Sequence, residues 1–203
     1  MPVSSIVIDD FLEDPEAFRN VALGLSYPVR EGEAFPGRNS VEQLNLSGLD
    51  QEISAIVREP LRAPHPPQSH GRCRVTLARD STKPAKIHID PSYWSGVLYL
   101  SRPEDCRGGT EFYRHLPTGT DGAPTDPAKL RELGFTSYEA LNQQILQKDV
   151  HDRSKWELTS TVPMRFNRLV LLRGWLWHTS GNGFGDTIEN GRLVYLMFFR
   201  PAR

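Results

Sequence analysis

The stretch Lys86-Ile87-His88-Ile89-Asp90 is the part of the sequence from which the rest of the fold can be worked out. Side chains of an extended strand alternate between two faces, so His88 and Asp90 point to one side and the two isoleucines to the other. Two metal-ligand side chains on one face, backed by two β-branched apolar residues, predict half of a metal site on a buried sheet.

The other half of the predicted site has to come from elsewhere in the chain. A mononuclear iron(II) site of the two-histidine-one-carboxylate type needs three ligands on one octahedral face. His178 is the best candidate for the third ligand, because it directly follows the mostly apolar segment 171–177. His115 is the main rival, since it also follows a strand-like segment. The sequence favours His178, because no apolar strand led by an arginine follows His115. At a strand end, His115 is instead a candidate for facing the substrate.

Arg192 opens the apolar segment 192–199 and is the candidate for binding an anion. A guanidinium that faces the interior of a barrel needs an anionic partner, because burying it unpaired is costly. Its planar, bidentate donors suit a carboxylate. Asn190-Gly191 just before it is a turn signal, so a surface arginine is the alternative, and Arg173 and Arg200 are the other candidate anchors.

The order of a His-Xaa-Asp motif, a distal histidine and an arginine over residues 71–200 resembles that of the iron(II)- and 2-oxoglutarate-dependent dioxygenases, especially prolyl-hydroxylase-like and small bacterial-type hydroxylases. The resemblance implies that His88, Asp90 and His178 bind iron(II) and that Arg192 binds the far carboxylate of 2-oxoglutarate. The separation of Asp90 from His178, 88 residues (178 − 90), is long for this superfamily, so the spacing adds little.

Two more residues match the resemblance in part. Tyr99 stands in an apolar strand that resembles the one whose tyrosine binds the same carboxylate in oxygen-sensing prolyl hydroxylases, although Ser101 replaces the asparagine of that family. Thr110 follows Gly108-Gly109 one residue nearer than in the usual pattern, and Ala85 stands where the family has a tyrosine. The resemblance implies Tyr99 and Thr110 as cofactor-binding residues, with core packing as the alternative for Tyr99.

The periodicity of apolar residues predicts a mainly β fold with flanking helices. Helical spacing occurs at residues 14–24 and 50–58, within an N-terminal supporting region. After residue 70, period-two or fully apolar segments predict strands, and these lie at 73–78, 86–90, 94–101, 108–113, 168–177 and 192–199. The expected fold is a double-stranded β-helix, a jelly-roll of the cupin kind.

We expect one dioxygenase-like domain over residues 1–203, with helical support at 1–70 and a jelly-roll core at 71–203. Residues 116–160 carry two helix patterns and form an insertion in that core. The second pattern starts with the capping-box match Thr136-Xaa-Xaa-Glu139 and runs to about Lys148. We expect the insertion to lie over the barrel mouth as a mobile lid that excludes water.

Three further features concern the surroundings of the site. Residues 35–40, Phe-Pro-Gly-Arg-Asn-Ser, form a loop whose arginine and asparagine are candidates for contacting a substrate, with a solvated turn as the alternative. Trp175 and Trp177 share a face opposite to His178 and are expected to pack beneath the barrel. Trp94 is expected either in the core or at the barrel mouth.

The composition argues against several classes of function. A length of 203 residues suits one domain with a sizeable core, and a formal net charge of −1 indicates neither a nucleic-acid nor a membrane partner. No segment approaches the roughly 20 apolar residues of a membrane span. Two cysteines and no visible signal peptide predict reduced thiols and a cytoplasmic protein.

The resemblance implies an oxygenase that uses iron(II), 2-oxoglutarate and O₂ to hydroxylate an unactivated C–H bond, with release of succinate and CO₂. A small molecule, an amino acid or a carrier-bound metabolite is the expected substrate, because the sequence shows no basic groove. Related halogenases lack the carboxylate ligand, so Asp90 favours hydroxylation, with desaturation and ring formation left open. The alternatives are a cupin-like metal enzyme that does not use 2-oxoglutarate and a non-catalytic jelly-roll binding domain.

Overall fold

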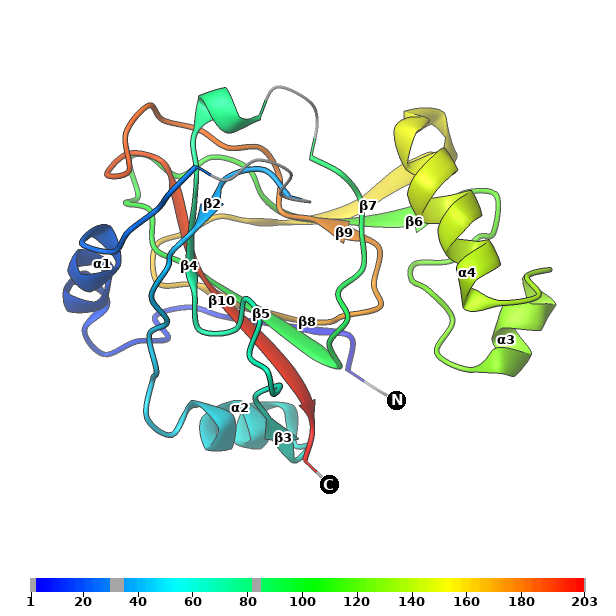
Figure 1. The fold of residues 1–203 in the computed structure, drawn as a ribbon, viewed down its shortest axis with the longest axis horizontal. Coiled ribbons are helices and arrows are strands. Elements are labelled where there is room, and N and C mark those ends of the chain that lie inside the picture. Colours follow the sequence, from blue (N-terminus) through cyan, green and yellow to red (C-terminus); the bar gives the residue numbers. More distant parts are fainter. Residues whose placement is uncertain (1–2, 30–34, 82–84, 203) are drawn as a thin grey trace.

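The computed structural model describes residues 3–29, 35–81 and 85–202, and most of its strands form two antiparallel sheets (Figure 1). The larger sheet has seven strands in the order β1-β8-β5-β10-β4-β2, with β3 paired to β10. Along the chain these are β1 (Ser5–Ile8), β2 (Arg38–Asn39), β3 (Leu61–Arg62), β4 (Cys73–Thr76), β5 (Trp94–Tyr99), β8 (Leu169–Arg173) and β10 (Arg192–Pro201). The smaller sheet has the order β7-β6-β9, with β6 (Gly109–His115), β7 (Trp156–Pro163) and β9 (His178–Thr179).

The space between the two sheets holds one apolar cluster to which both sheets contribute. Alternate residues of the large-sheet strands point into it, among them Val194 and Leu196 of β10 and Val170 and Leu172 of β8. Phe112 of β6 packs against the same cluster from the smaller sheet. This pair of facing sheets is the jelly-roll fold that the strand pattern predicts.

The other face of the large sheet is covered by the two N-terminal helices, α1 (Pro15–Leu23) and α2 (Leu49–Val57). Asp14 caps α1 by accepting a hydrogen bond of 2.9 Å from the backbone N–H of Ala17, and Pro15 occupies the first turn. Both helices lie within one residue of their predicted bounds. The large sheet therefore has one face covered by helices and one face toward the smaller sheet.

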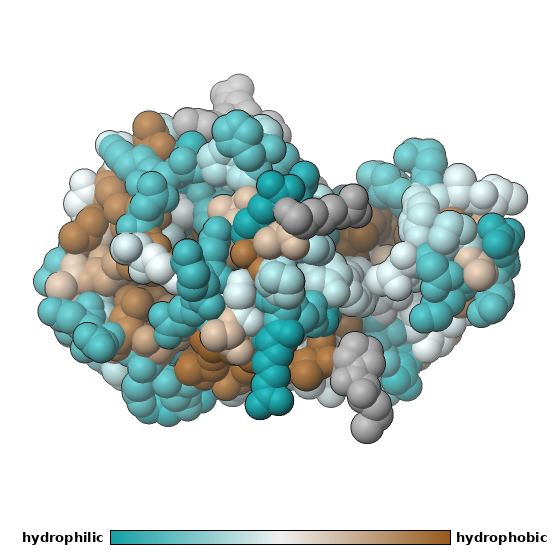
Figure 2. Space-filling model, turned by 90° about the horizontal axis from the view of Figure 1, so that it is seen from below, coloured by the Kyte–Doolittle hydropathy of each residue, from teal (hydrophilic) through white to brown (hydrophobic). Residues whose placement is uncertain are grey.

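Residues between β6 and β7 form the helical insertion, which projects from one end of the molecule as a lobe (Figures 1 and 2). It contains α3 (Pro127–Glu132), α4 (Tyr138–Leu141), a π-helical segment η2 (Asn142–Lys148) and two 3₁₀ turns, η3 (Asp149–His151) and η4 (Arg153–Lys155). The predicted capping box at Thr136 is wrong. The cap of α4 is Ser137, whose side chain accepts a hydrogen bond from the backbone N–H of Ala140 at 3.1 Å.

The predicted position of the insertion as a lid is also wrong. Its buried residues, such as Leu141 and Ile145, share a cluster with Ile87 and Trp177. These two side chains belong to the faces of their segments that point away from His88 and His178. The insertion therefore covers the outer side of the small sheet, because its apolar residues pack on the apolar side chains at the back of the ligand segments.

Three predicted boundaries differ from the structure for local reasons. Residues 156–160 belong to β7 and are not part of the insertion. Residues 86–90 form no ladder and make a single bridge, between His88 and His178. The predicted strand 168–177 ends at Arg173, because Gly174 lies against the turn after Asp90, where a Cβ atom would come within 2.1 Å of the Ser92 carbonyl oxygen. Within the described ranges, no helix is long and apolar enough to cross a membrane.

Candidate metal and co-substrate site

His88, Asp90 and His178 converge at the mouth of the space between the two sheets. Each offers one ligand atom, and these atoms lie within 4.8 Å of one another. Nε2 of His178 lies 3.4 Å from Oδ2 of Asp90, and Nε2 of His88 lies 3.8 Å from Oδ1. Three ligands on one octahedral face with bonds of about 2.1 Å would stand roughly 3 Å apart, so a small inward movement of these side chains suits a divalent metal.

The backbone aligns the two histidines with each other. The N–H groups of His88 and His178 each donate to the carbonyl oxygen of the other, at 2.9 and 3.1 Å. Their Nδ1 atoms lie 2.9 and 2.8 Å from the carbonyl oxygens of Lys86 and Leu176, which can only accept. In the neutral imidazoles Nδ1 therefore carries the proton, and the lone pair of Nε2 faces Asp90, as a metal ligand requires.

The charges of the three groups are strongly coupled. Burial and the nearby His178 lower the pKa of His88 to about 4, so this imidazole is neutral at pH 7. Burial by itself would raise the pKa of the Asp90 carboxyl, but His178, which can donate from Nε2 when its ring is protonated, lowers that pKa, aided by Ser95, so it lies below its usual range. Burial opposes protonation of His178, whereas Asp90 raises its pKa overall. The site thus presents an ionised carboxylate to two imidazoles.

A cavity of about 290 Å³ opens beside the three candidate ligands. Its inner wall is mainly apolar and includes Val97, Leu172 and Leu196 from the large sheet. Thr110 of β6 also lines it, whereas no residue of the insertion does within the described part of the chain. The cavity therefore connects the candidate metal site with the inter-sheet interior, and this is where a small molecule has room to bind.

Arg192, Tyr99 and Thr110 meet at the inner end of the site. The Tyr99 hydroxyl lies 2.7 Å from Oγ1 of Thr110 and accepts a hydrogen bond of 2.9 Å from the Thr110 backbone N–H. The Arg192 guanidinium carbon lies 5.9 Å from the centre of the Tyr99 ring. Of these three residues Thr110 lines the cavity, and the other two are buried next to it.

Arg192 is buried, and it forms no ion pair with any residue that the structure describes. Its side chain is 2% exposed, and Nε and Nη2 have no hydrogen-bond partner among the residues that the structure describes. Burial lowers the pKa of this guanidinium, which reflects the cost of holding a cation there. Ser101 fixes the strand start around it, since its Oγ donates to the Gly191 carbonyl at 2.8 Å and accepts from the Leu193 N–H at 2.9 Å.

The alternative anchors, Arg173 and Arg200, are not at this site. Arg173 is buried on the opposite face of the large sheet, where it forms an ion pair with Glu59 and stacks on the rings of Tyr93 and Trp94. Arg200 is exposed near the end of β10 and neighbours β3. Trp94 is fully buried in the helix-covered core, so of its two predicted positions the core is the one observed.

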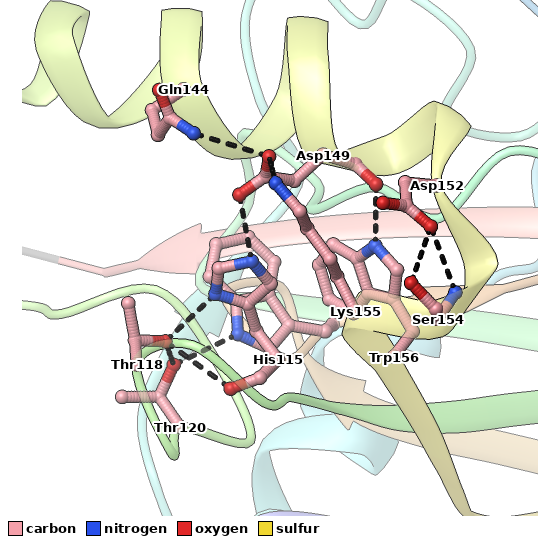
Figure 3. Close-up of polar contacts among 10 residues, drawn as sticks. His115, Thr118, Thr120, Gln144, Asp149, Asp152, Ser154, Lys155 and Trp156 are labelled. Carbon is pink, nitrogen blue, oxygen red and sulfur yellow. Dashed lines mark hydrogen bonds and ion pairs between the residues drawn. The ribbon is translucent and has the colours of Figure 1, made fainter.

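His115, the rival ligand, belongs to a different cluster (Figure 3). Its Nε2 lies 3.1 Å from Oδ2 of Asp149, and its Nδ1 lies 2.9 Å from Oγ1 of Thr118. Lys155 pairs with the other oxygen of Asp149 at 2.5 Å, and the Trp156 indole N–H donates to the Asp149 carbonyl at 3.0 Å. This network is buried between β6 and the insertion. It holds the insertion in place and does not face the cavity.

The 35–40 loop reaches the cavity through residues other than those predicted. Phe35 and Pro36 line the cavity, and Arg74 of β4 lines it beside them with its guanidinium carbon 3.5 Å from the centre of the Phe35 ring. Asn39 instead holds Arg74, accepting from its Nε at 2.7 Å. Arg38 lies near Asp80, at 3.7 Å.

The overall fold is shared with solved structures of 2-oxoglutarate-binding proteins. HygX from Streptomyces hygroscopicus with nickel, 2-oxoglutarate and hygromycin B bound matches with a TM-score of 0.55 at 17% identity, covering 98% of this chain and 83% of the other. The same protein with nickel and 2-oxoglutarate bound gives a TM-score of 0.50 at 16% identity, with the same coverage. A prolyl hydroxylase from Trichoplax adhaerens in complex with a hypoxia inducible factor peptide reaches 0.44 at 10% identity, covering 97% of this chain and 83% of the other, which is too distant to add to the argument.

These likenesses establish the fold, a jelly-roll of the kind found in HygX. By sequence, the chain belongs to the family described as "Family of unknown function (DUF6445)", which it matches over residues 3–199. Comparison with curated proteins gave no match.

Among the polar residues that the sequence interpretation missed, Ser95 is one that contacts a candidate ligand directly. Ser95 donates a hydrogen bond of 2.6 Å to Oδ2 of Asp90 from the start of β5. Its signal was present, since a serine in the apolar strand 94–100 shares a face with Val97 and Tyr99. Period-two alternation therefore already places Ser95 on the interior face.

Proposed function

We propose that this protein is an iron(II)- and 2-oxoglutarate-dependent hydroxylase, in which His88, Asp90 and His178 bind the metal and Arg192 binds the far carboxylate of 2-oxoglutarate. The observation that carries the proposal is the burial of the unpaired Arg192 guanidinium beside Tyr99, whose hydroxyl contacts Thr110 in the wall of the cavity next to the three ligands. A buried cation is costly without an anion, and a dicarboxylate that reaches from the metal toward Arg192 would supply one.

The residues present fit both groups. Two neutral imidazoles and one carboxylate are the donor set of the non-haem iron(II) oxygenases, and they leave ligand positions open for a co-substrate. When iron(II) and 2-oxoglutarate are bound, the chemistry supplied is the O₂-dependent conversion of 2-oxoglutarate to succinate and CO₂, coupled to hydroxylation of a substrate C–H bond. HygX, which shares this fold, has been solved with nickel and 2-oxoglutarate bound, and this supports a joint site for a divalent metal and 2-oxoglutarate here.

The protein's own residues would position the co-substrate and exclude water from the reaction. Thr110 faces the cavity, and its hydroxyl, together with that of Tyr99, supplies neutral donors next to the Arg192 charge. The apolar wall formed by Val97, Leu172 and Leu196 excludes water from the space between these donors and the metal ligands.

The size of the cavity favours a small substrate or a small group of a larger one. About 290 Å³ has to hold 2-oxoglutarate and the reacting part of the substrate together. Phe35, Pro36 and Arg74 line this cavity as well and would contact the substrate. Hygromycin B in HygX is an example of a small-molecule ligand in this fold, and we expect a small molecule or an amino-acid-like group here too.

The direct test is the conversion of 2-oxoglutarate to succinate in the absence of a known substrate. Purified protein reconstituted with iron(II) is expected to convert 2-oxoglutarate slowly to succinate with consumption of O₂, as measured by succinate formation. The variants His178→Ala and Asp90→Ala should abolish it, whereas the exposed-histidine variant His151→Ala should leave it unchanged. Succinate formation that is equal in the His178→Ala protein would contradict the proposal and favour a cupin-like or non-catalytic function.

A further inference from the structure

The carboxylate of Asp90 is held by a buried serine of the neighbouring strand. Ser95 is the first inward-facing residue of β5, and it is 1% exposed. Its Oγ lies 2.6 Å from Oδ2 of Asp90. An ionised carboxylate has no proton to give, so the Ser95 hydroxyl is the donor of this short, charge-assisted hydrogen bond.

A second serine fixes the direction of the first. Oγ of Ser92 lies 2.6 Å from Oγ of Ser95. Ser95 has one hydroxyl proton, which it donates to Asp90, so Ser92 must donate to Ser95. The turn that carries Ser92 packs on Gly174, and the backbone N–H of Asp90 donates to the Gly174 carbonyl at 2.7 Å. Both the backbone and the side chain of Asp90 are therefore held from the large sheet.

The three candidate ligands need different kinds of support. The rings of His88 and His178 are oriented by backbone carbonyl oxygens at Nδ1. The carboxylate of Asp90 has a free rotation about its last carbon–carbon bond unless a donor holds one oxygen. Ser95 is the side chain outside the ligand set that makes such a contact among the described residues.

We infer that Ser95 is a positioning residue of the metal site, which sets the rotation of the Asp90 carboxylate toward the two imidazoles. The inference rests on the proposed function, because it needs a metal at these ligands. Donors to metal-bound side chains typically raise metal affinity by about 10- to 100-fold. A purely structural serine would instead change the stability of the fold and leave the affinity of the folded protein for metal unchanged.

The test measures metal affinity rather than turnover. Anaerobic titration of the apoprotein with iron(II), in competition with a chromophoric chelator, gives the dissociation constant for wild type, Ser95→Ala and Ser95→Thr. Cobalt(II) titration adds the visible spectrum, which reports the ligand geometry. Ser40→Ala is the matched control, because Ser40 is also 1% exposed and, among the described residues, its Oγ bonds only to backbone groups of Glu42 and Cys73.

We expect Ser95→Ala to weaken iron(II) binding by about 10-fold or more and to alter the cobalt(II) spectrum. Ser95→Thr keeps the hydroxyl and should stay within about 3-fold of wild type, and Ser40→Ala should match wild type. Equal affinities for wild type and Ser95→Ala would overturn the inference while leaving the proposed function intact. Wild-type protein that binds no metal would overturn both.

A folding defect in Ser95→Ala would not prevent the test. Ser95→Cys keeps the shape of the side chain with a weaker donor, and Ser92→Ala removes the group that orients Ser95. Both are expected to bind iron(II) more weakly than wild type, with Ser95→Cys more affected because it acts on Asp90 directly. Wild-type affinity in both variants would contradict the positioning role.

Discussion

Arg192 shows at the scale of one residue how a site for an anion can be identified. Its guanidinium is buried beside Tyr99, and two of its nitrogens have no hydrogen-bond partner within the described part of the chain. The sequence already placed an arginine at the head of an apolar strand, and the structure adds that Val194 and Leu196 on the same face line the inter-sheet interior. The anion that this cation needs is the basis for two predictions.

The first prediction concerns co-substrate affinity. Arg192→Ala removes one partner of a partly desolvated charge pair, a loss of about 2–5 kcal/mol. The dissociation constant for 2-oxoglutarate is therefore expected to rise by about 30-fold or more, measured by titration of the iron(II)-loaded protein. Arg192→Lys should keep part of the affinity, because it keeps the charge but loses the bidentate geometry. Iron(II) binding should survive, and Arg200→Ala is the control. Unchanged 2-oxoglutarate affinity in Arg192→Ala would contradict the assignment of Arg192 as the residue that binds the co-substrate carboxylate.

The second prediction concerns stability without ligands. An apolar side chain of similar length needs no anion, so Arg192→Met is expected to stabilise the apoprotein by about 1 kcal/mol or more. The same variant should lose 2-oxoglutarate binding, which is the trade-off expected of a residue kept for function. Thermal denaturation of the apo forms measures the effect. A lower melting temperature for Arg192→Met would show that Arg192 is satisfied in the apoprotein.

At the scale of elements, the insertion acts as a support of the ligand segment. Its cluster includes Ile87, and Arg153 donates to the carbonyl oxygen of Ala85 at 3.1 Å. The His115–Asp149 network fastens the insertion to β6 (Figure 3). Anything that loosens this network is therefore expected to loosen the segment that carries His88.

The third prediction is that low pH weakens the His115–Asp149 network and so lowers the stability of the protein. Burial lowers the pKa of His115 against the opposing effect of Asp149, and the pKa of Asp149 is also lowered, by Lys155, Gln144 and His115 against the effect of burial. A lowered pKa in the fold means that stability is complete above the ordinary value, about 6.5 for histidine, and is lost as the pH falls. The free energy of unfolding should therefore fall below pH 6.5, by up to about 1.4 kcal/mol per pH unit from His115, and the melting temperature should fall with it.

The matched variants for this prediction lie in the same insertion. His115→Gln should flatten the pH dependence between pH 6.5 and 5, whereas the exposed His151→Gln should keep it. Hydrogen exchange at residues 138–155 locates the change. Identical pH profiles for wild type and His115→Gln would show that this histidine does not govern the docking of the insertion.

The elements also show which parts of the site the sequence predicts. Period-two alternation and the resemblance together point to the ligands and to Arg192, because strand geometry fixes which residues share a face. At Gly109 there is no room for a side chain, because a Cβ atom would lie 2.0 Å from the Val162 carbonyl oxygen. The place of the insertion was mispredicted, because helix patterns say which residues are apolar but not which apolar surface they cover. Alternation places Ser95 on the interior face, but its hydrogen bond to Asp90 becomes visible only in the structure.

At the scale of the whole molecule, the site joins segments that are distant in the chain. His88 and Asp90 precede β5, and His178 belongs to β9 of the smaller sheet. A metal bound by all three side chains would link the segment before β5 to strand β9. Only the folded protein offers this set of ligands. Metal binding is therefore coupled to global stability.

The fourth prediction follows from this coupling. A divalent metal at about 100 times its dissociation constant should stabilise the fold by about 2.7 kcal/mol. For a chain of this size the melting temperature should rise by about 5–10 °C, and a chelator should reverse the rise. Asp90→Ala should show no metal-dependent shift. A shift of equal size in that variant would mean that the metal binds elsewhere.

The central claim is that one site binds iron(II) and 2-oxoglutarate together, and one spectroscopic titration tests it most directly. Iron(II) is added anaerobically to the apoprotein and then 2-oxoglutarate, while the visible metal-to-ligand charge-transfer absorption is followed. We predict a band that requires both additions, that is lost in His178→Ala, and that needs about 30-fold more 2-oxoglutarate in Arg192→Ala. Absence of the band in wild type, or a band that survives unchanged in His178→Ala, would contradict the account.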